Sequence, residues 1–497
     1  MRVELLQPDA DLEFGNGDRC PDMRFGIGHY GTFDFADAES PARQIKLGFV
    51  GTEETIGSLI EWLEKCSYEI PGKPSKQPRL YPPFPGYAKN HSFHSTLVWS
   101  QSDFRTVSIP QSAKSGSFNE VVKKVVDLYV EEIDKVIEKS GADVVMCAPP
   151  LEHLKLVTHV PGMAEVAEEE AVEEQPPPAD QDEEKNQEEE TTWYEFHDLL
   201  KAKSLHLRTP LQYILPATYD ESKLSAQRKL KNREHQDEAT RAWNLFTAIY
   251  YKARGIPWRM TRDDADVRTC YLGVSFFRTL DKKKIYASSA QVFNERGEGV
   301  IVRGGIAYED KDDRTIHLDE NGAYNIIKLA LDAFKGKHGH YPARVVLHKT
   351  SSFTKDENDG FMRFLKEKEI EFVDFLYLRD SYIRLYRPNV YPPLRGTLWH
   401  LEDRKAILYT KGSVPFYETY PGTYPPKSLY MDCEYAQRSV KELARECMAL
   451  SKMNWNNTRF DGQFPITLRA ARQVGLILKY LEGADTDKIS PSYRFYM

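Results

Sequence analysis

The chain has 497 residues, including 28 Tyr, 24 Phe and 7 Trp, which is enough for two or three domains with proper cores. Its start, "MRVELLQPDADLEF", lacks the basic and apolar segments of a signal peptide, and no stretch reaches the ~18 apolar residues of a membrane span, so we expect a cytoplasmic protein without a membrane segment. Six scattered cysteines without a CxxC pair argue against a zinc site and a disulfide framework.

The net charge of −8 is concentrated in one insertion at residues 163–191. Between Ala164 and Thr191 it holds 13 acidic residues and one lysine, so its local charge is −12 and the rest of the chain carries +4. A segment this acidic and this poor in apolar residues cannot offset its ordering entropy, which predicts disorder. The remaining chain is mildly basic, which permits nucleic-acid binding without requiring it.

The chain up to about residue 265 is predicted to alternate between strands and helices. Helices placed between strands are typical of a mostly parallel, Rossmann-like sheet. The absence of a GxGxxG motif argues against a dinucleotide site, so we expect no NAD on this chain. The predicted elements, in order, are a strand and a helix within 45–66, strand 93–100, helix 118–141, strand 142–150, helix 193–205, strand 210–218 and helix 238–258.

From about residue 266 the pattern changes to neighbouring strands followed by a helix. This β-β-β-α-β order is typical of an RNase H-like core. The predicted strands are 270–278, 284–294 and 299–309; helix 321–337 and strand 343–351 follow, then strands 370–380 and 405–413 and the final helices 435–455 and 465–483.

Such a core cleaves phosphodiesters only when several carboxylates converge on metal ions ~4 Å apart. Two strand positions normally provide aspartates, and here they hold Ser275 and Thr350, whose hydroxyls do not replace anionic ligands. The predicted domain is therefore a nuclease scaffold without its catalytic carboxylates. The alternative is a metal site rearranged from nearby acidic residues, which are otherwise predicted to be solvated loop charges: Asp281, Glu309, Asp310, Asp356 and Glu357.

Four stretches together resemble prokaryotic Argonaute proteins, and more narrowly the short type with MID and PIWI domains only. They are "DMRFGIGHYGTFD", "FHDLLKAKSLHLRTPLQYI", "TKGSVPFYETYPGTYPPKSL" and "LSKMNWNNTRFDGQFPITLRAARQVG". The resemblance implies an α/β chain with a Rossmann-like MID domain and its N-terminal lead-in at 1–265, interrupted by the acidic insertion, and a catalytically inactive, RNase H-like PIWI domain at 266–497.

The second stretch carries a candidate phosphate site. His197 and Lys201 are four residues apart on a predicted helix, so they project from one face; Gln212 lies on the next strand and Lys252 ends a later helix. Family resemblance implies that these four residues bind the 5′-phosphate of a guide by charge-assisted hydrogen bonds. The alternative is that they are ordinary surface residues, with Lys252 favoured by the helix dipole.

The resemblance further implies a Mg²⁺ ion at the guide phosphate, held by Gln212 and the terminal carboxylate of Met497. A second interpretation of "SYRFYM", compatible with the first, is a hydrophobic tail packed on the core. Guide and target backbones would contact polar residues of "NWNNTRF" and the following helix, although the asparagines could instead satisfy backbone groups at a helix junction. These residues are Asn454, Asn456, Asn457, Arg459, Arg469 and Arg472.

By resemblance, the chain binds a 5′-phosphorylated guide RNA and recognises complementary single-stranded DNA from an invading plasmid or phage. It would then activate, in trans, a partner carrying an APAZ domain and an effector of TIR, sirtuin-like or nuclease type, often one that consumes NAD. We expect a heterodimer and a higher oligomer on activation. The alternatives are a guided nuclease with a displaced metal site and a scaffold without effector control.

Overall fold

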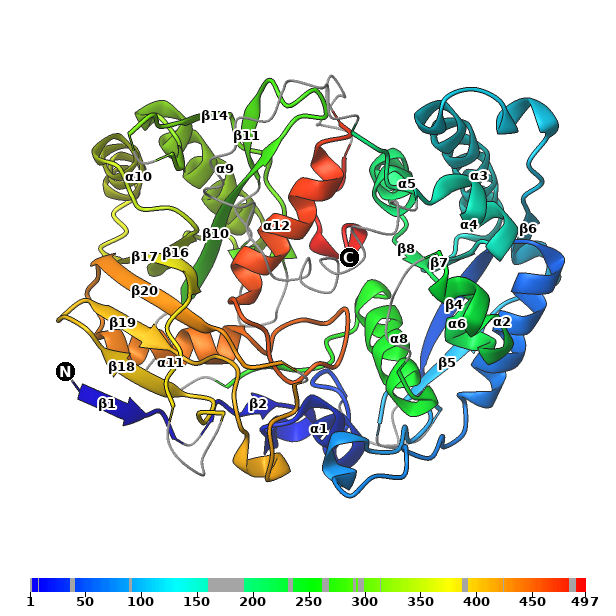
Figure 1. Ribbon diagram of the computed structural model, residues 1–497, viewed down its shortest axis with the longest axis horizontal. Helices are drawn as coiled ribbons and strands as arrows, with labels where there is room; N and C mark the ends of the chain where they lie inside the picture. Colours follow the sequence, from blue (N-terminus) through cyan, green and yellow to red (C-terminus); the bar gives the residue numbers. More distant parts are fainter. Residues whose placement is uncertain are drawn as a thin grey trace.

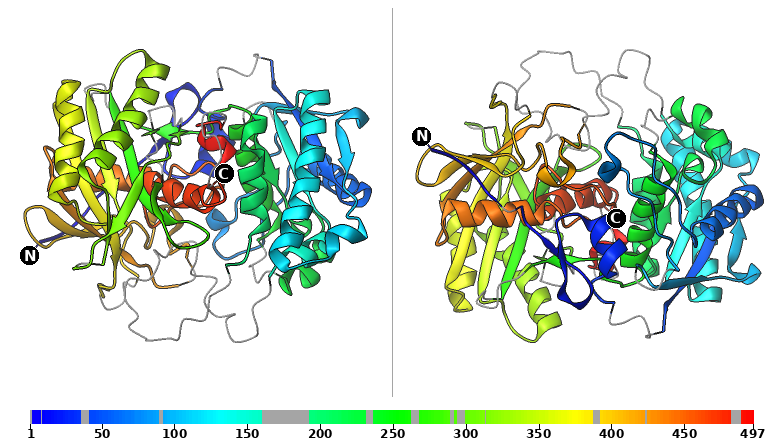
Figure 2. Two further views of the ribbon diagram at one scale, coloured as in Figure 1. Left: turned by 90° about the horizontal axis from the view of Figure 1, so that it is seen from above. Right: turned by 90° about the horizontal axis from the view of Figure 1, so that it is seen from below.

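The computed structural model describes residues 2–7, 9–35, 41–88, 92–159, 192–230, 236–261, 268–288, 292–293, 299–312, 314–386, 392–422, 424–481 and 489–497. The insertion predicted at 163–191 lies outside these residues. Figure 1 places most of the N-terminal half on the right and the C-terminal half on the left. The C-terminus lies between the two halves in every view, and the N-terminus lies at the outer edge of the C-terminal half (Figures 1 and 2).

The N-terminal half is built on a parallel sheet with the strand order β5-β4-β7-β8, to which β6 adds beside β4. Helices cover both faces, since α2 and α8 share one core with β4 while α3 and α5 share another. This arrangement confirms the predicted Rossmann-like sheet. The strands are β4 (Arg43–Gly51), β5 (Ser95–Val98), β6 (Phe104–Thr106), β7 (Val144–Ala148) and β8 (Leu211–Tyr213); the helices are α2 (Glu53–Lys65), α3 (Phe118–Ser140), α4 (Leu151–Val157), α5 (Phe196–Ser204), α6 (Pro216–Tyr219), α7 (Leu224–Arg228) and α8 (Glu238–Lys252).

Local sequence explains the ends of the long helices. A capping box formed by Ser117 and Glu120 begins α3, and Gly141 ends it with a positive φ of 60° that favours glycine. Asp237 caps α8 by accepting the backbone N–H of Thr240, and the helix ends at Lys252. The cap of α8 and its apolar inner face therefore fix where its last lysine lies.

The C-terminal half contains a sheet that is twelve-stranded among the described residues, with the main path β1-β18-β19-β20-β17-β16-β10-β11-β14-β15. Strands β10, β16 and β17 are parallel neighbours, and α9 and α10 cover one face while α11 and α12 cover the other. The predicted RNase H-like order is confirmed. The bounds are β10 (Thr269–Arg278), β11 (Ile285–Ser288), β12 (Val292–Phe293), β13 (Gly299–Val300), β14 (Ile306–Glu309), β15 (Ile316–His317), α9 (Glu320–His338), β16 (Arg344–Lys349), α10 (Lys355–Glu367), β17 (Phe372–Ser381), β18 (Thr397–His400), β19 (Lys405–Leu408), β20 (Ser428–Tyr435), α11 (Val440–Leu450) and α12 (Ile466–Leu478).

The N-terminal lead-in crosses to the C-terminal sheet. Strand β1 (Arg2–Leu5) pairs antiparallel with β18, so the first residues of the chain form the outer edge of that sheet. Strands β2 (Leu12–Glu13), β3 (Arg19–Cys20) and β9 (Arg259–Met260) then form a small sheet near the junction of the halves, and helix α1 (Met23–Tyr30) follows. The lead-in assigned to the first domain thus contributes a strand to the second.

Three of the four Argonaute-like stretches meet in space. Asp22 caps α1 and pairs with Arg24, and Tyr417 from the third stretch donates its hydroxyl to Asp22. The ring of Tyr417 packs against Phe460 of the fourth stretch, at 5.0 Å between centroids. Lys452 lies over the same Phe460 ring, 4.3 Å from its centroid. These stretches therefore form one structural junction.

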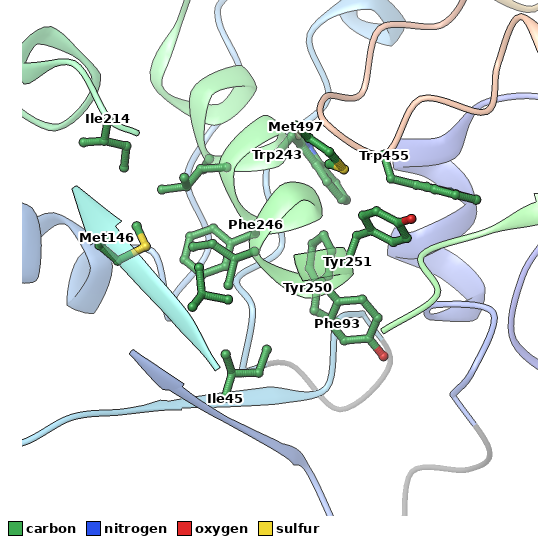
Figure 3. Close-up of a cluster of buried hydrophobic side chains, with 14 of the residues drawn as sticks. Ile45, Phe93, Met146, Ile214, Trp243, Phe246, Tyr250, Tyr251, Trp455 and Met497 are labelled. Atoms are coloured by element: carbon green, nitrogen blue, oxygen red, sulfur yellow. The ribbon is translucent and has the colours of Figure 1, made fainter. Parts of the chain in front are cut away.

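A continuous hydrophobic core joins the halves. Figure 3 shows Trp243, Phe246, Tyr250 and Tyr251 of α8 with Met497 and Trp455 from the C-terminal half. The Trp455 indole donates to the backbone oxygen of Trp258, and its ring lies 4.8 Å from that of Tyr251. Within the described part of the chain, no helix is long and apolar enough to cross a membrane.

Candidate nucleic-acid interface

Three elements of the N-terminal half bring the predicted phosphate residues together. Helix α5 carries His197 and Lys201, β8 carries Gln212, and Lys252 is the last residue of α8. The Lys252 Nζ donates to Gln212 Oε1 at 2.6 Å. The charge of Lys201 acts on Lys252, which places both ammonium groups in one cluster. We call these four residues the lysine cluster.

Neither lysine of this cluster is a surface residue. Lys201 is 3% exposed and Lys252 is 2% exposed. Burial lowers the pKa of Lys201 to about 8, although the carboxylate of Asp198 opposes the change. Burial and then the charge of Lys201 lower the pKa of Lys252 well below its usual range. Holding a proton on both buried lysines is unfavourable until an anion neutralises them.

Asp198 is the acidic neighbour of the cluster. Its Oδ1 lies 2.8 Å from His197 Nδ1. Burial by itself would raise the pKa of Asp198, but the hydrogen bond from His197 and the charges of His197, Lys479 and Lys201 lower it overall. The carboxylate of Asp198 therefore lies near several cationic groups.

Lys479 was not predicted as a site residue. It directly follows α12 of the C-terminal half, and its charge reaches Asp198 on α5. The same contact includes the backbone N–H of Glu195, which donates to the Tyr480 hydroxyl at 2.9 Å. Only the packing of α12 on α5 brings these residues together, so no local sequence signal identifies Lys479.

The two residues named for magnesium are both engaged within the fold. Gln212 Oε1 accepts the Lys252 ammonium, and Gln212 Nε2 donates to the backbone oxygen of Tyr213 at 3.1 Å. The ammonium therefore engages one lone pair of the amide oxygen that the magnesium prediction names. The Met497 side chain is buried in the core between the halves, as the hydrophobic-tail interpretation predicted.

The asparagine-rich stretch forms a loop between α11 and α12 and packs on α8. Asn454 Oδ1 accepts the backbone N–H of Asn456, and Asn457 Oδ1 accepts that of Arg459, both at 3.1 Å. Two of the asparagines thus satisfy local backbone groups, which is the alternative that the sequence left open. Asn456 and Arg459 have exposed side chains that lie within reach of solvent.

The two predicted arginines of α12 differ in their surroundings. Arg472 stacks over Phe464 at 4.1 Å, and burial lowers its pKa to about 10 while the charge of Asp380 opposes the change. Arg472 therefore contributes to packing within the fold. Arg469 is half-buried, and its charge acts on Tyr493 in the short 3-10 helix η10 (Tyr493–Phe495) near the C-terminus.

Ser275 and Thr350 occupy neighbouring positions on two parallel strands, three residues before the end of β10 and directly after β16. Val274 and Lys349 are register partners on β10 and β16, so the next residue on each strand is the predicted serine or threonine. Ser275 is only 4% exposed. The two positions that would hold metal-binding aspartates are therefore neighbours in the sheet, and both carry neutral hydroxyl groups.

The prediction that Glu357 is a solvated loop charge is wrong. Glu357 is fully buried and lies 2.8 Å from the buried Lys349 Nζ, with His317 Nδ1 at 3.3 Å. It also forms the capping box of α10 with Thr354 and accepts the backbone N–H of Leu318 at 2.9 Å. The carboxylate was misassigned because only the folded sheet brings Lys349 to it.

The other acidic residues near the strand ends are mostly exposed. Asp281, Glu309 and Asp356 have exposed side chains, which confirms the solvated interpretation for them, and Asp310 is half-exposed. Glu309 pairs with Arg278 at 2.6 Å. Among the residues that the structure describes, no three His, Cys, Asp or Glu side chains form a group that could hold a metal ion.

Comparisons with known proteins agree on the fold. No family model and no curated protein matches the chain. Similar solved structures include the Clostridium butyricum Argonaute bound to a guide DNA and a 19-mer target DNA, with a TM-score of 0.61 and 16% identity over 96% of this chain and 53% of that one. A second is A. aeolicus Argonaute, with a TM-score of 0.56 and 13% identity over 97% of this chain and 54% of that one. A third is Aa-Ago with externally bound siRNA, with a TM-score of 0.58 and 14% identity over 97% of this chain and 54% of that one.

This chain thus spans about half the length of the Argonaute structures it matches. It has an Argonaute fold, with a Rossmann-like half of the MID type followed by an RNase H-like half of the PIWI type. At these identities the likeness establishes the fold alone.

Proposed function

We propose that the chain binds a guide strand by its 5′-phosphate and uses that guide to bind a complementary strand without cleaving it. The observation that carries the proposal is the pair of buried lysines, Lys201 and Lys252, which lie beside the amide of Gln212 and the carboxylate of Asp198. A terminal phosphate dianion would neutralise both ammonium groups and restore their ordinary pKa values.

The arrangement favours the end of a strand over its middle. Both lysines are almost fully buried, so a ligand must insert its anionic group into the fold to reach them. A terminal phosphate can be inserted in this way, whereas an internal phosphate has a sugar on each side. His197 on α5 is part-exposed and can donate to the phosphate when protonated.

The lack of cleavage is proposed from the chemistry of the PIWI-like half. Ser275 and Thr350 offer hydroxyls where two-metal hydrolysis requires carboxylates. Glu357 is neutralised by Lys349 and cannot serve as a metal ligand without breaking that pair. A guided protein with these features would recognise its target and leave it intact.

Recognition without cleavage needs an effector to have a consequence, and we propose one in trans. The four Argonaute-like stretches resemble the short type, which works with a partner carrying an APAZ domain and a TIR, sirtuin-like or nuclease effector. On this proposal the NAD-consuming chemistry belongs to the partner, the guide is RNA, the target is invading single-stranded DNA, and the two chains form a heterodimer. The magnesium ion at the guide phosphate remains a prediction, to be tested by binding with and without EDTA.

The test is a binding measurement with a cleavage assay on the same complexes. We expect the purified chain to bind a short 5′-phosphorylated RNA and then complementary DNA, and to leave that DNA uncut in Mg²⁺ or Mn²⁺. Cleavage that depends on Asp281 or Glu309 would instead support a displaced metal site. A protein that binds neither strand would be a scaffold that only shares the fold.

A further inference from the structure

A short segment after β17 presents two of the most exposed tyrosines of the described chain. Tyr382 is 92% exposed and Tyr386 is 74% exposed. Arg384 lies between them and is also exposed, so an aromatic, a cation and an aromatic occupy alternate positions. We call these three residues the tyrosine row. Exposed rings with a cation between them are suited to stacking on a planar ligand.

The backbone that carries the row is fixed to the sheet. The Tyr409 hydroxyl accepts the N–H of Leu385 at 2.7 Å and lies 3.3 Å from the backbone oxygen of Ile383. The Ser428 hydroxyl donates to the same Ile383 oxygen at 2.8 Å. Because the intervening residues are anchored from β20 and from the end of β19, the exposed side chains are held on a pre-organised support.

The arginine of the row is oriented as well. Arg384 Nη1 donates to the backbone oxygens of Ser381 and Ile383, at 2.8 Å and 3.1 Å. A guanidinium has five N–H donors, so this anchoring leaves others for a ligand. The segment from Tyr382 to Tyr386 contains no acidic residue, and its local charge is positive.

The row lies past the carboxyl end of β17, on the side of the sheet where its parallel strands end. Strands β10, β16 and β17 run parallel, so their carboxyl ends lie at the same edge. Ser275 and Thr350 lie toward that edge, and Tyr382 lies five residues beyond Tyr377, the register partner of Lys349, directly after β17 ends. In open sheets of parallel strands, ligands bind outside the carboxyl ends of the strands.

We propose that the tyrosine row stacks on unpaired nucleotides of the target strand that flank the guide-paired part. Aromatic rings stack on any base, and an arginine adds attraction to both the bases and the phosphates. The row would hold the target beside a site that does not cleave it. This inference rests on the proposed function, because it requires that a target strand be bound.

The experiment uses the full chain loaded with a 5′-phosphorylated RNA guide. Its affinity is measured for complementary DNA with single-stranded flanks and for the same DNA with abasic flanks. We expect wild type to bind the flanks with bases at least about tenfold more tightly, since stacking contributes that much per base. Tyr382→Ala/Tyr386→Ala should lose the difference, whereas Tyr382→Phe/Tyr386→Phe should keep it.

The controls separate this inference from the proposed function. Tyr68→Ala removes another exposed tyrosine, 77% exposed and distant from β17, and should behave as wild type. Guide affinity should be equal in all these proteins. Equal binding of both flanks by wild type, or a retained difference in the alanine variant, would contradict stacking on the tyrosine row. A surface that binds a protein partner instead would give that result.

If neither wild type nor the variants bind the guide, the proposed function fails, and the tyrosine row is then tested without a guide. The probes are then an unguided single-stranded DNA and its abasic counterpart, with the same variants. Weaker binding of the DNA by the alanine variant alone would support the row, and equal binding would overturn it.

Discussion

The two halves of the molecule each bury lysines beside a functional position, and they treat that charge in opposite ways. In the PIWI-like half, Lys349 pairs with the buried Glu357 at 2.8 Å and also donates to the backbone oxygen of Ser352. In the MID-like half, Lys252 donates to a neutral amide and lies near Lys201. Glu357 neutralises Lys349 within the fold, whereas Lys252 requires an anionic ligand for neutralisation.

This difference in pairing indicates that Lys349 stabilises the fold, whereas Lys201 and Lys252 serve to bind a ligand. Removing one partner of a buried ion pair lowers the free energy of unfolding, because the other charge is left buried without compensation. A buried cluster of like charges lowers the free energy of unfolding and is retained where ligand binding compensates it. The contrast predicts that equivalent lysine substitutions will have opposite effects on stability in the two halves.

The largest effect is expected at Lys349. Lys349→Met leaves Glu357 buried without its cation, so unfolding in urea should require about 3–5 kcal/mol less free energy. The double variant Lys349→Met/Glu357→Met removes both charges and should recover part of that loss. An unfolding midpoint unchanged in Lys349→Met would show that the pair does not stabilise this half.

The matched substitution in the lysine cluster should have the opposite sign. The pKa of Lys201 falls to about 8, so holding its charge in the fold at neutral pH costs up to about 3 kcal/mol. Lys201→Met should therefore raise the urea midpoint while weakening the binding of a 5′-phosphorylated RNA about 10- to 100-fold. A variant that loses stability and keeps its affinity would contradict the assignment.

The pH dependence follows from the same pKa. Between pH 8 and 10.5 the unfolded chain holds a proton on Lys201 that the folded chain has lost, so stability due to this group rises with pH. Phosphate binds the protonated form, so affinity should fall as pH rises above about 8, by up to about tenfold per unit. Fluorescence anisotropy titrations across this range, with Lys201→Met as the control, test the trend; a pH-independent affinity would contradict it.

The smallest effect is expected at the exposed acidic residues of the PIWI-like half. Asp281→Asn and Glu309→Gln change solvated side chains, so the unfolding midpoint and the binding of guide and target should match wild type. The same preparations report on cleavage in Mn²⁺. Target DNA cut by wild type and left intact by either variant would replace the proposed function with a guided nuclease.

Much of the fold could be predicted because its elements have strong periodicity. The helix predicted at 118–141 is α3 with its glycine cap, and the strand predicted at 343–351 contains β16. Helix α10 was not predicted, since its sequence "KDENDGFMRFLKE" is charged and contains Gly360. A Cβ at Gly360 would lie 2.1 Å from the backbone oxygen of Glu320, so this glycine permits close packing of α10 on α9.

The candidate site could be predicted only where its residues share a local pattern. The four-residue spacing of His197 and Lys201 places both on α5, and resemblance supplied Gln212 and Lys252. Burial of the lysines, the contribution of Lys479 and the pairing of Glu357 depend on contacts between distant segments. Periodicity carries no information on such contacts, so these features required the folded structure.

The most direct test compares a short RNA with a 5′-phosphate to the same RNA with a 5′-hydroxyl, on wild type and on Lys201→Met/Lys252→Met. We predict that wild type prefers the phosphate by about 100-fold or more and that the double variant binds both RNAs equally while remaining folded. Equal affinity of wild type for the two RNAs, or a phosphate preference that survives in the double variant, would contradict the lysine cluster as the guide site.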